Sequence, residues 1–162
     1  MKNSEIEKTF IEMVKQNERI IYKVCSFYVS DDFSIADLYQ EVVCNLWSAY
    51  SKFRGESAFS TWLYRIALNT CVSVIRKVKR HLRSVPIADL QEVLPTPEDM
   101  SEDICEMYRL IYRLGTLERA IVLLWIEGQS YQEIADVTGL TVSNVATKLK
   151  RAKEKLNQMS KY

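Results

Sequence analysis

The sequence is poor in the residues that catalysis and metal binding usually require. It contains a single histidine, His81, and no C-x-x-C pair. Metal sites need clustered ligands and nucleophilic catalysis needs a nucleophile beside a base, so we predict no metal, no cofactor and no enzymatic activity. The cysteines are expected to be small buried hydrophobes that stay reduced. These are Cys25, Cys44, Cys71 and Cys105.

Long apolar runs and a secretory signal are also missing. No stretch of about 18 apolar residues occurs, so no segment is predicted to span a membrane. The N-terminus, which reads MKNSEIEKTF, is mixed in charge and lacks the apolar core of a signal peptide. We therefore expect a cytoplasmic protein without membrane insertion.

The net charge is only +1, but the charges are unevenly distributed along the chain. One basic run comprises Arg76, Lys77, Lys79, Arg80 and Arg83, and a second comprises Lys148, Lys150, Arg151, Lys153 and Lys155. Between them, residues 85–107 are rich in Asp and Glu and contain neither Lys nor Arg. The near-neutral total thus conceals two cationic surfaces and an anionic connector.

Proline marks a boundary between two domains. All three prolines, Pro86, Pro95 and Pro97, lie in the acidic stretch, where they end helices. Strand-like alternation and hairpin glycine pairs are missing, which predicts an all-α fold. We expect two small helical domains, residues 1–83 and 101–162, joined by an acidic linker over residues 84–100.

The first domain is predicted to contain three helices. Apolar residues at helical spacing predict one helix over residues 4–28, Ser34 is a suitable N-cap for the second, and the third is expected over residues 57–83. In the second helix one arc is apolar and the opposite arc is polar. The polar arc, which periodicity alone leaves open as a solvated or a contact surface, contains Asp37, Gln40, Glu41, Asn45 and Ser48.

The segment between the second and third helices combines aromatic, basic and hydroxyl side chains over residues 51–62. Aromatic rings can stack on unpaired bases, cations can hold phosphates, and hydroxyls can bond to either. The alternative is that Phe53, Phe59 and Trp62 are core residues beside a loop. The sequence leaves both interpretations open.

A helix-turn-helix is the clearest motif of the second domain. Ser130 is predicted to cap a short helix, Gly139 makes the turn, and the second helix begins at Thr141 or Ser143, with Val145 filling the gap beneath it. Such a pattern also occurs as simple packing in helical proteins. The outward side chains nevertheless suit base edges and phosphates in a major groove: Ser143, Asn144, Thr147, Lys148, Lys150 and Arg151.

Taken in order, these motifs resemble the extracytoplasmic-function (ECF) sigma factors of bacterial RNA polymerase, in the sigma-70 family, over nearly the whole chain. Residues 37–47 and 53–69 look like region 2, and residues 127–135 look like region 4. The resemblance implies a region 2 bundle and a region 4 helix-turn-helix. It also implies a subunit that binds core RNA polymerase, recognises −35 and −10 promoter elements, helps to melt the −10 DNA and directs transcription initiation.

The resemblance assigns a role to each set of residues. Docking on a coiled coil of the polymerase β′ subunit is implied for Asp37, Gln40, Glu41 and Asn45. Contact with −10 DNA, including a base flipped from the nontemplate strand, is implied for Lys52, Phe53, Arg54, Ser57, Phe59, Ser60, Thr61, Trp62, Arg65, Asn69, Arg76, Lys77 and Arg80. Contact with the double-stranded −35 element is implied for Arg119, Ser130, Tyr131, Ser143, Asn144, Thr147, Lys148, Lys150 and Arg151.

The family also supplies expected partners. The second domain would rest on the polymerase β flap, the linker would thread the RNA exit channel, and an anti-sigma factor is expected. Three residues depart from the family pattern: Ser73 stands where Asp is common, Gly115 where Pro is common, and Ala146 where Lys or Arg is usual. The preferred −35 sequence is therefore not inferred from relatives.

A helix-turn-helix regulator with a helical sensor domain is the alternative interpretation. It accounts for the C-terminal half of the chain but not for the pattern that runs from Gln40 to Trp62. It also predicts a dimer on a palindromic site. Gel filtration together with binding to core polymerase distinguishes the two.

Overall fold

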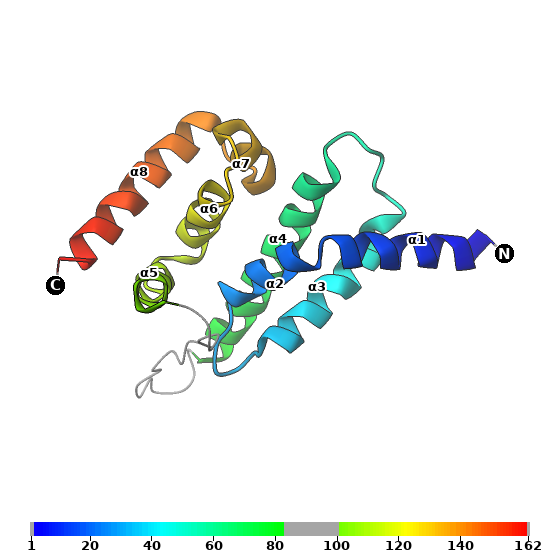
Figure 1. Cartoon of the computed structure of the whole chain (residues 1–162), viewed down its shortest axis with the longest axis horizontal. Helices are drawn as coiled ribbons and strands as arrows, with labels where there is room; N and C mark the ends of the chain where they lie inside the picture. Colours follow the sequence, from blue (N-terminus) through cyan, green and yellow to red (C-terminus); the bar gives the residue numbers. More distant parts are fainter. Residues whose placement is uncertain (1, 83–100, 162) are drawn as a thin grey trace. The chain divides into compact units, whose positions relative to one another are not determined.

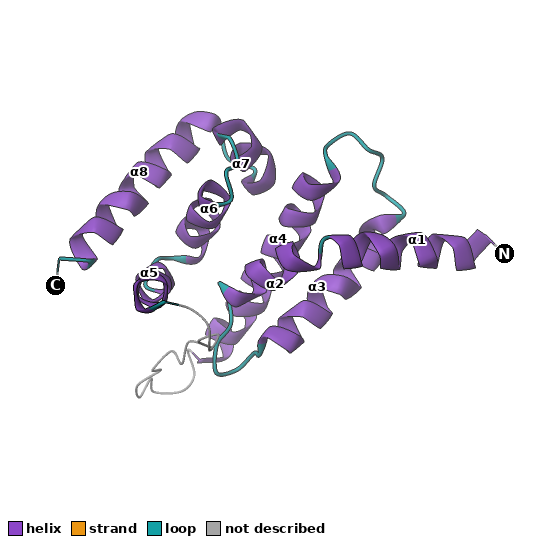
Figure 2. Ribbon diagram, in the orientation of Figure 1, coloured by secondary structure: helices purple, strands orange, loops and turns teal. Residues whose placement is uncertain are grey.

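The computed structural model describes residues 2–82 and 101–161 of a chain that divides into two compact units. Every regular element in these ranges is a helix, as Figure 2 shows. The all-α prediction is therefore confirmed. The predicted acidic linker, residues 84–100, lies outside the described residues, and so do the side chains of residues 79–82.

Within residues 2–82, the first unit is a bundle of α1 (Lys2–Gln16), α2 (Glu18–Ser26), α3 (Ile35–Tyr50) and α4 (Phe59–Leu82) (Figure 1). Helices α2, α3 and α4 pack on one another and share a fully buried core that includes Ile21, Val24, Leu38, Val42, Leu46 and Leu63. Helix α1 adds Phe10 and Val14. The bundle leaves one side of α3 and one side of α4 facing outward.

The prediction of one helix over residues 4–28 is wrong, because the chain breaks at Asn17. The backbone of Asn17 leaves the helical region (φ −112°, ψ 13°). Its side-chain amide donates to the carbonyl of Met13 at 2.8 Å. Asparagine competes in this way for backbone groups that a continuous helix would use, so α1 and α2 form as separate helices.

The start of α3 is fixed by a capping box, as the Ser34 cap predicted. The amide of Asp37 donates to the Ser34 hydroxyl at 3.1 Å, and the Ser34 amide donates back to the Asp37 carboxylate at 3.1 Å. Two otherwise unpaired helix-terminal donors are satisfied reciprocally. The box fixes where α3 begins, and burial of Leu38, Val42 and Leu46 determines which of its side chains face outward.

The cysteines follow the prediction only in part. Cys25 and Cys71 are buried in the core of the first unit, where a side-chain hydrogen bond with Cys25, together with burial, raises the pKa of the Cys71 thiol. Cys105 is half-buried, and Cys44 is exposed on α3. The expectation of a buried hydrophobe is therefore wrong for Cys44, which lies on the outward side of an amphipathic helix.

Within residues 101–161, the second unit contains α5 (Glu102–Tyr112), α6 (Thr116–Ile126), α7 (Tyr131–Thr138) and α8 (Val142–Met159). Helix α6 packs against both α7 and α8, and its residues 119–124 are buried. Its first turn begins after Gly115, whose amide donates to the Glu118 carboxylate at 3.2 Å. Proline, which is common at this position in the family, has no such donor.

Helices α7 and α8 form the predicted helix-turn-helix. Ser130 and Glu133 make a capping box at the start of α7. Gly139 has a positive φ of 75° in the turn, a conformation that glycine adopts without strain. Thr141 caps α8 by accepting from the Asn144 amide at 3.1 Å, and Val145 is fully buried beneath the turn. The local signals in the sequence therefore describe this motif correctly.

Candidate nucleic-acid interface

Three aromatic rings form a cluster where the loop after α3 meets the start of α4. The ring centroids of Phe53 and Trp62 are 5.0 Å apart, those of Phe59 and Trp62 are 5.4 Å apart, and those of Phe53 and Phe59 are 5.6 Å apart. All three side chains are half-buried. The rings thus support one another, as core residues would, while they keep surface that an unpaired base can cover.

A polar stripe on α4 continues from this cluster. At about 100° per residue, Trp62, Arg65, Asn69 and Arg76 lie within a narrow arc of the helix, and the last three are exposed. Ser73, where the family commonly has Asp, is exposed on the same stripe. The stripe forms a continuous exposed polar surface beside the rings.

The other residues predicted to contact −10 DNA differ in accessibility. Lys52, Arg54 and Lys77 are exposed, and Ser57 and Ser60 are half-buried. Thr61 is only 7% exposed, so its side chain belongs to the packing of α4 rather than to an open surface. This is a correction to its predicted role, and it follows from the helical position of Thr61 on the bundle side of α4. The Arg80 side chain lies outside the described residues.

Helix α3 presents its polar arc to solvent. Asp37, Gln40 and Glu41 are exposed, as predicted, and Asp37 also closes the helix cap. Trp47 was missed by the sequence analysis, although it is 43% exposed and lies one turn beyond Cys44 on the same outward side. An exposed tryptophan on an otherwise polar helix face is a recurrent feature of protein interfaces.

Asn45 has a partner within the bundle. Its amide nitrogen donates to the hydroxyl of Thr70 on α4 at 2.9 Å, and that hydroxyl donates to the Ile66 carbonyl at 2.7 Å. Asn45 is exposed, and its amide nitrogen also fastens α3 to α4. This bond joins α3, which carries the polar arc, directly to α4, which carries the polar stripe. The contact of Asn45 with the polymerase stays a prediction.

The outward side of α8 carries most of the residues expected to contact −35 DNA. Ser143, Asn144, Thr147, Lys150 and Arg151 are exposed and lie opposite the buried residues of the helix. Ser130 is exposed but its hydroxyl is engaged in the cap of α7, and Tyr131 is 41% exposed. Lys148 is half-buried at the flank of α8, near enough to Glu118 to lower the pKa of that carboxyl, and Ala146 is half-buried.

Two further cations of the second basic run turn toward α6. The ammonium group of Lys153 lies 3.9 Å from the centre of the Trp125 ring, and that of Lys155 lies 2.7 Å from a Glu118 oxygen. Burial by itself raises the pKa of Glu118, but hydrogen bonds from Lys155 and from the Gly115 amide bring the net shift downward. The basic run is therefore not one uniform DNA-facing surface.

Arg119 was predicted to contact DNA, and the structure assigns it a different role. Its side chain is buried, with 9% of the residue exposed. The guanidinium donates to the carbonyl of Tyr112 at 2.8 Å and to that of Leu114 at 3.3 Å, and it lies over the Tyr112 ring at 4.9 Å. Arg119 thus satisfies the carbonyl of Tyr112, the last residue of α5, and that of Leu114 in the turn before α6.

None of the helices in residues 2–82 and 101–161 is both long and apolar enough to cross a membrane. The same residues contain no cluster of three or more side chains suited to holding a metal ion. The side chains that do gather are aromatic, cationic and amide-bearing. Together they define a protein with two separate helical units, each with an outward surface suited to nucleic acid.

Comparison with known proteins gives the family. Residues 13–81 match the family model described as Sigma-70 region 2, and residues 106–156 match Sigma-70, region 4. The chain is 30% identical to the ECF RNA polymerase sigma-E factor of Escherichia coli (strain K12), over 93% of this chain and 86% of that protein. It is 32% identical to the sigma-E factor of Haemophilus influenzae, over 91% and 85%.

Solved structures show the same fold. The sigma factor RpoE in complex with the anti-sigma factor NepR from Bartonella quintana matches with a TM-score of 0.81 at 20% identity, over 95% of this chain and 98% of that chain. CnrH in complex with the cytosolic domain of CnrY matches with a TM-score of 0.67 at 21% identity, over 96% and 89%. The chain therefore belongs to the ECF sigma factors of the sigma-70 family. It is a promoter-recognising transcription initiation factor.

Proposed function

We propose that the first unit docks on core RNA polymerase through the outward side of α3 and holds the melted −10 strand beside α4. The observation that carries this proposal is that the two helices expose different kinds of side chain. Helix α3 presents the exposed carboxylates of Asp37 and Glu41 with the Gln40 amide, whereas the polar stripe, which includes cations, lies on α4. Carboxylates suit arginines of a protein partner, and cations suit phosphates.

At the −10 element, the cluster of Phe53, Phe59 and Trp62 receives an unpaired base. Stacking on an aromatic side chain contributes about 1–3 kcal/mol per base, which offsets much of the cost of unpairing. The cations at Arg65 and Arg76 then follow the backbone of the same strand. This assignment is supported by the partial exposure of all three rings and by the alignment of the stripe with them.

At the −35 element, the second unit inserts α8 into the major groove. Asn144 and Thr147 lie near the N-terminal end of α8, where recognition helices contact base edges. Lys150 and Arg151 lie one turn further along and reach phosphates. Lys153 and Lys155 contribute less, because each already has a partner on α6.

A regulatory partner completes the proposal. One solved structure described above is a sigma factor in complex with the anti-sigma factor NepR, and the other is CnrH in complex with the cytosolic domain of CnrY. By analogy, this chain binds an anti-sigma factor, acts in the cytoplasm where the polymerase acts, and leaves the chemistry of RNA synthesis to the core enzyme.

Run-off transcription with core polymerase from the source organism, followed by start-site mapping, tests the function. The wild-type chain should produce discrete transcripts that core enzyme alone does not. Trp62→Ala should depress transcription from duplex promoters and be partly rescued by a template that is already unpaired at −10. A variant of Ile11, which is 50% exposed on α1, is the matched control. Transcription by Trp62→Ala at the wild-type rate on duplex DNA would contradict the −10 assignment.

A further inference from the structure

Helix α1 borders the outward side of α3 through one aromatic residue, Phe10. The Phe10 side chain is 6% exposed. Its ring meets the Trp47 ring edge-to-face at a centroid distance of 4.9 Å and the Tyr50 ring edge-to-face at 5.2 Å. Phe10 precedes residues 13–81, the part of the chain that matches the region 2 family model. Phe10 therefore lies outside the stretch that the family model covers.

One side of the Trp47 side chain contacts Phe10, and the other side is exposed to solvent. It is 43% exposed although it packs against Phe10. On α3 it lies seven residues after Gln40, which places both side chains on the same outward side of the helix. A large apolar ring at the border of a polar face has the character of an interface anchor, whose contribution depends on its being held in the bound conformation.

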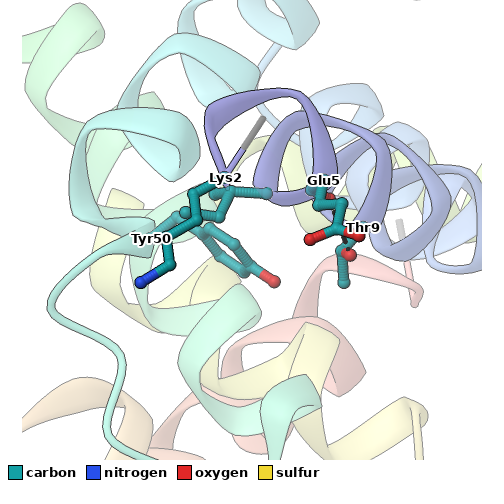
Figure 3. A pocket seen from close by; sticks show the side chains of 5 residues that line it. Lys2, Glu5, Thr9 and Tyr50 are labelled. Atoms are coloured by element: carbon teal, nitrogen blue, oxygen red, sulfur yellow. Dashed lines mark hydrogen bonds between the residues drawn. The ribbon is translucent and has the colours of Figure 1, made fainter.

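One further contact holds α1 beside the end of α3, and a groove lies next to it. The Tyr50 hydroxyl lies 3.1 Å from the sulfur of Met13. Lys2, Glu5 and Thr9 of α1 face Tyr50 across a shallow groove of about 390 Å³, which Figure 3 shows and which Ile6 also lines. Helix α1 therefore meets the last turn of α3 through Phe10 and Met13, and Phe10 is the residue that touches Trp47.

We propose that Phe10 is a positioning residue for polymerase docking: it holds the Trp47 indole as the apolar anchor at the border of the polar face of α3. The occupant of this surface is the same partner that binds Asp37, Gln40 and Glu41, because Trp47 is continuous with them on one helix side. The inference rests on the proposed docking of α3 and extends it to α1.

A double-mutant cycle on the full chain tests this role. Trp47→Ala is expected to weaken binding to purified core polymerase about 30-fold, as loss of an interface anchor does. Phe10→Leu, which keeps an apolar side chain but removes the ring, is expected to weaken it about fivefold, because the indole must then be ordered on binding. Phe10→Tyr keeps the ring and should bind like wild type. Ile11→Ala on α1 is the control and should also bind like wild type.

The cycle separates a positioning role from general destabilisation. Phe10→Leu should have no further effect in the Trp47→Ala background, and in a chain whose sole tryptophan is Trp47 it should shift the fluorescence emission to longer wavelength. If Phe10→Leu is too unstable to purify, Phe10→Met provides the same test. An equal loss of affinity in both backgrounds would overturn the inference. Wild-type binding by Trp47→Ala would also overturn the inference. The proposed docking of α3 would still hold in that case if Glu41→Ala weakened binding.

Discussion

Replacing Arg119 distinguishes an internal clamp from a DNA contact. In Arg119→Met, the carbonyls of Tyr112 and Leu114 lose the guanidinium that donates to them at 2.8 and 3.3 Å. Each buried acceptor left without a partner costs about 1–3 kcal/mol, and the lost cation–π contact with Tyr112 adds about 0.5–1 kcal/mol. The 3.3 Å bond to Leu114 contributes less to stability than the 2.8 Å bond to Tyr112. We therefore expect the unfolding free energy of the second unit to fall by about 3 kcal/mol.

Urea denaturation of the full chain measures this loss in the unit concerned. With Trp47 and Trp62 replaced by Phe, the remaining tryptophan, Trp125, reports only the second unit. Arg119→Lys keeps the charge but lacks the planar fork that reaches two carbonyls, so it should lose less stability than Arg119→Met.

A contact between Arg119 and DNA would give a different pair of results. If Arg119 instead contacted a phosphate, Arg119→Met would change the unfolding free energy by less than about 0.5 kcal/mol. It would also lower the slope of log affinity against log salt by about one. That combination, measured with −35 duplex DNA and holoenzyme, would refute the internal role.

Three further predictions concern other residues. Glu41→Ala should weaken core binding without changing Tm, whereas Asp37→Ala should also remove about 1 kcal/mol of stability by opening the α3 cap; equal melting of the two variants in circular dichroism would contradict this. Thr147 substitutions should change which −35 sequences a promoter library selects, whereas Arg151→Ala should weaken all promoters together and reduce the salt slope by about one. Glu118 has a lowered pKa, so its contribution to stability is present above about pH 4.3 and is lost as the pH falls through the folded pKa; Glu118→Gln should abolish that part of the acid loss seen in pH-dependent urea titrations.

Local sequence signals predicted those parts of the fold that local interactions determine. Ser34 and Ser130 cap their helices through bonds to residues three positions away, and Gly139 adopts the positive φ that its turn requires. The break at Asn17 was missed because one polar side chain outweighed an apolar periodicity that continues on both sides of it. The exposure of Trp47 was missed because a tryptophan on a helix is more often buried.

Roles that depend on distant partners could not be predicted in this way. Asn45 and Thr70 are 25 residues apart, and Glu118 and Lys155 are 37 residues apart. In the sequence, Asn45 is one more polar residue of an outward arc and Lys155 one more cation of a basic run. Only the packing of α3 on α4 and of α6 on α8 shows that their polar groups are already engaged.

The cations of α8 lie on different sides of the helix: some face outward and others contact α6. At about 100° per residue, Lys150 and Arg151 fall on the side opposite the buried Val145 and Leu149, whereas the positions of Lys153 and Lys155 flank the buried side and meet α6. Glu154 is exposed on the outward side, between the positions of Lys150 and Arg151. The outward side of the C-terminal half of α8 therefore carries little net positive charge. In the proposed −35 docking, base contacts are made by the first two turns, where Asn144 and Thr147 lie. These turns offer base edges the neutral groups of the two residues, and Lys148 is the one cation there, since position 146 is alanine.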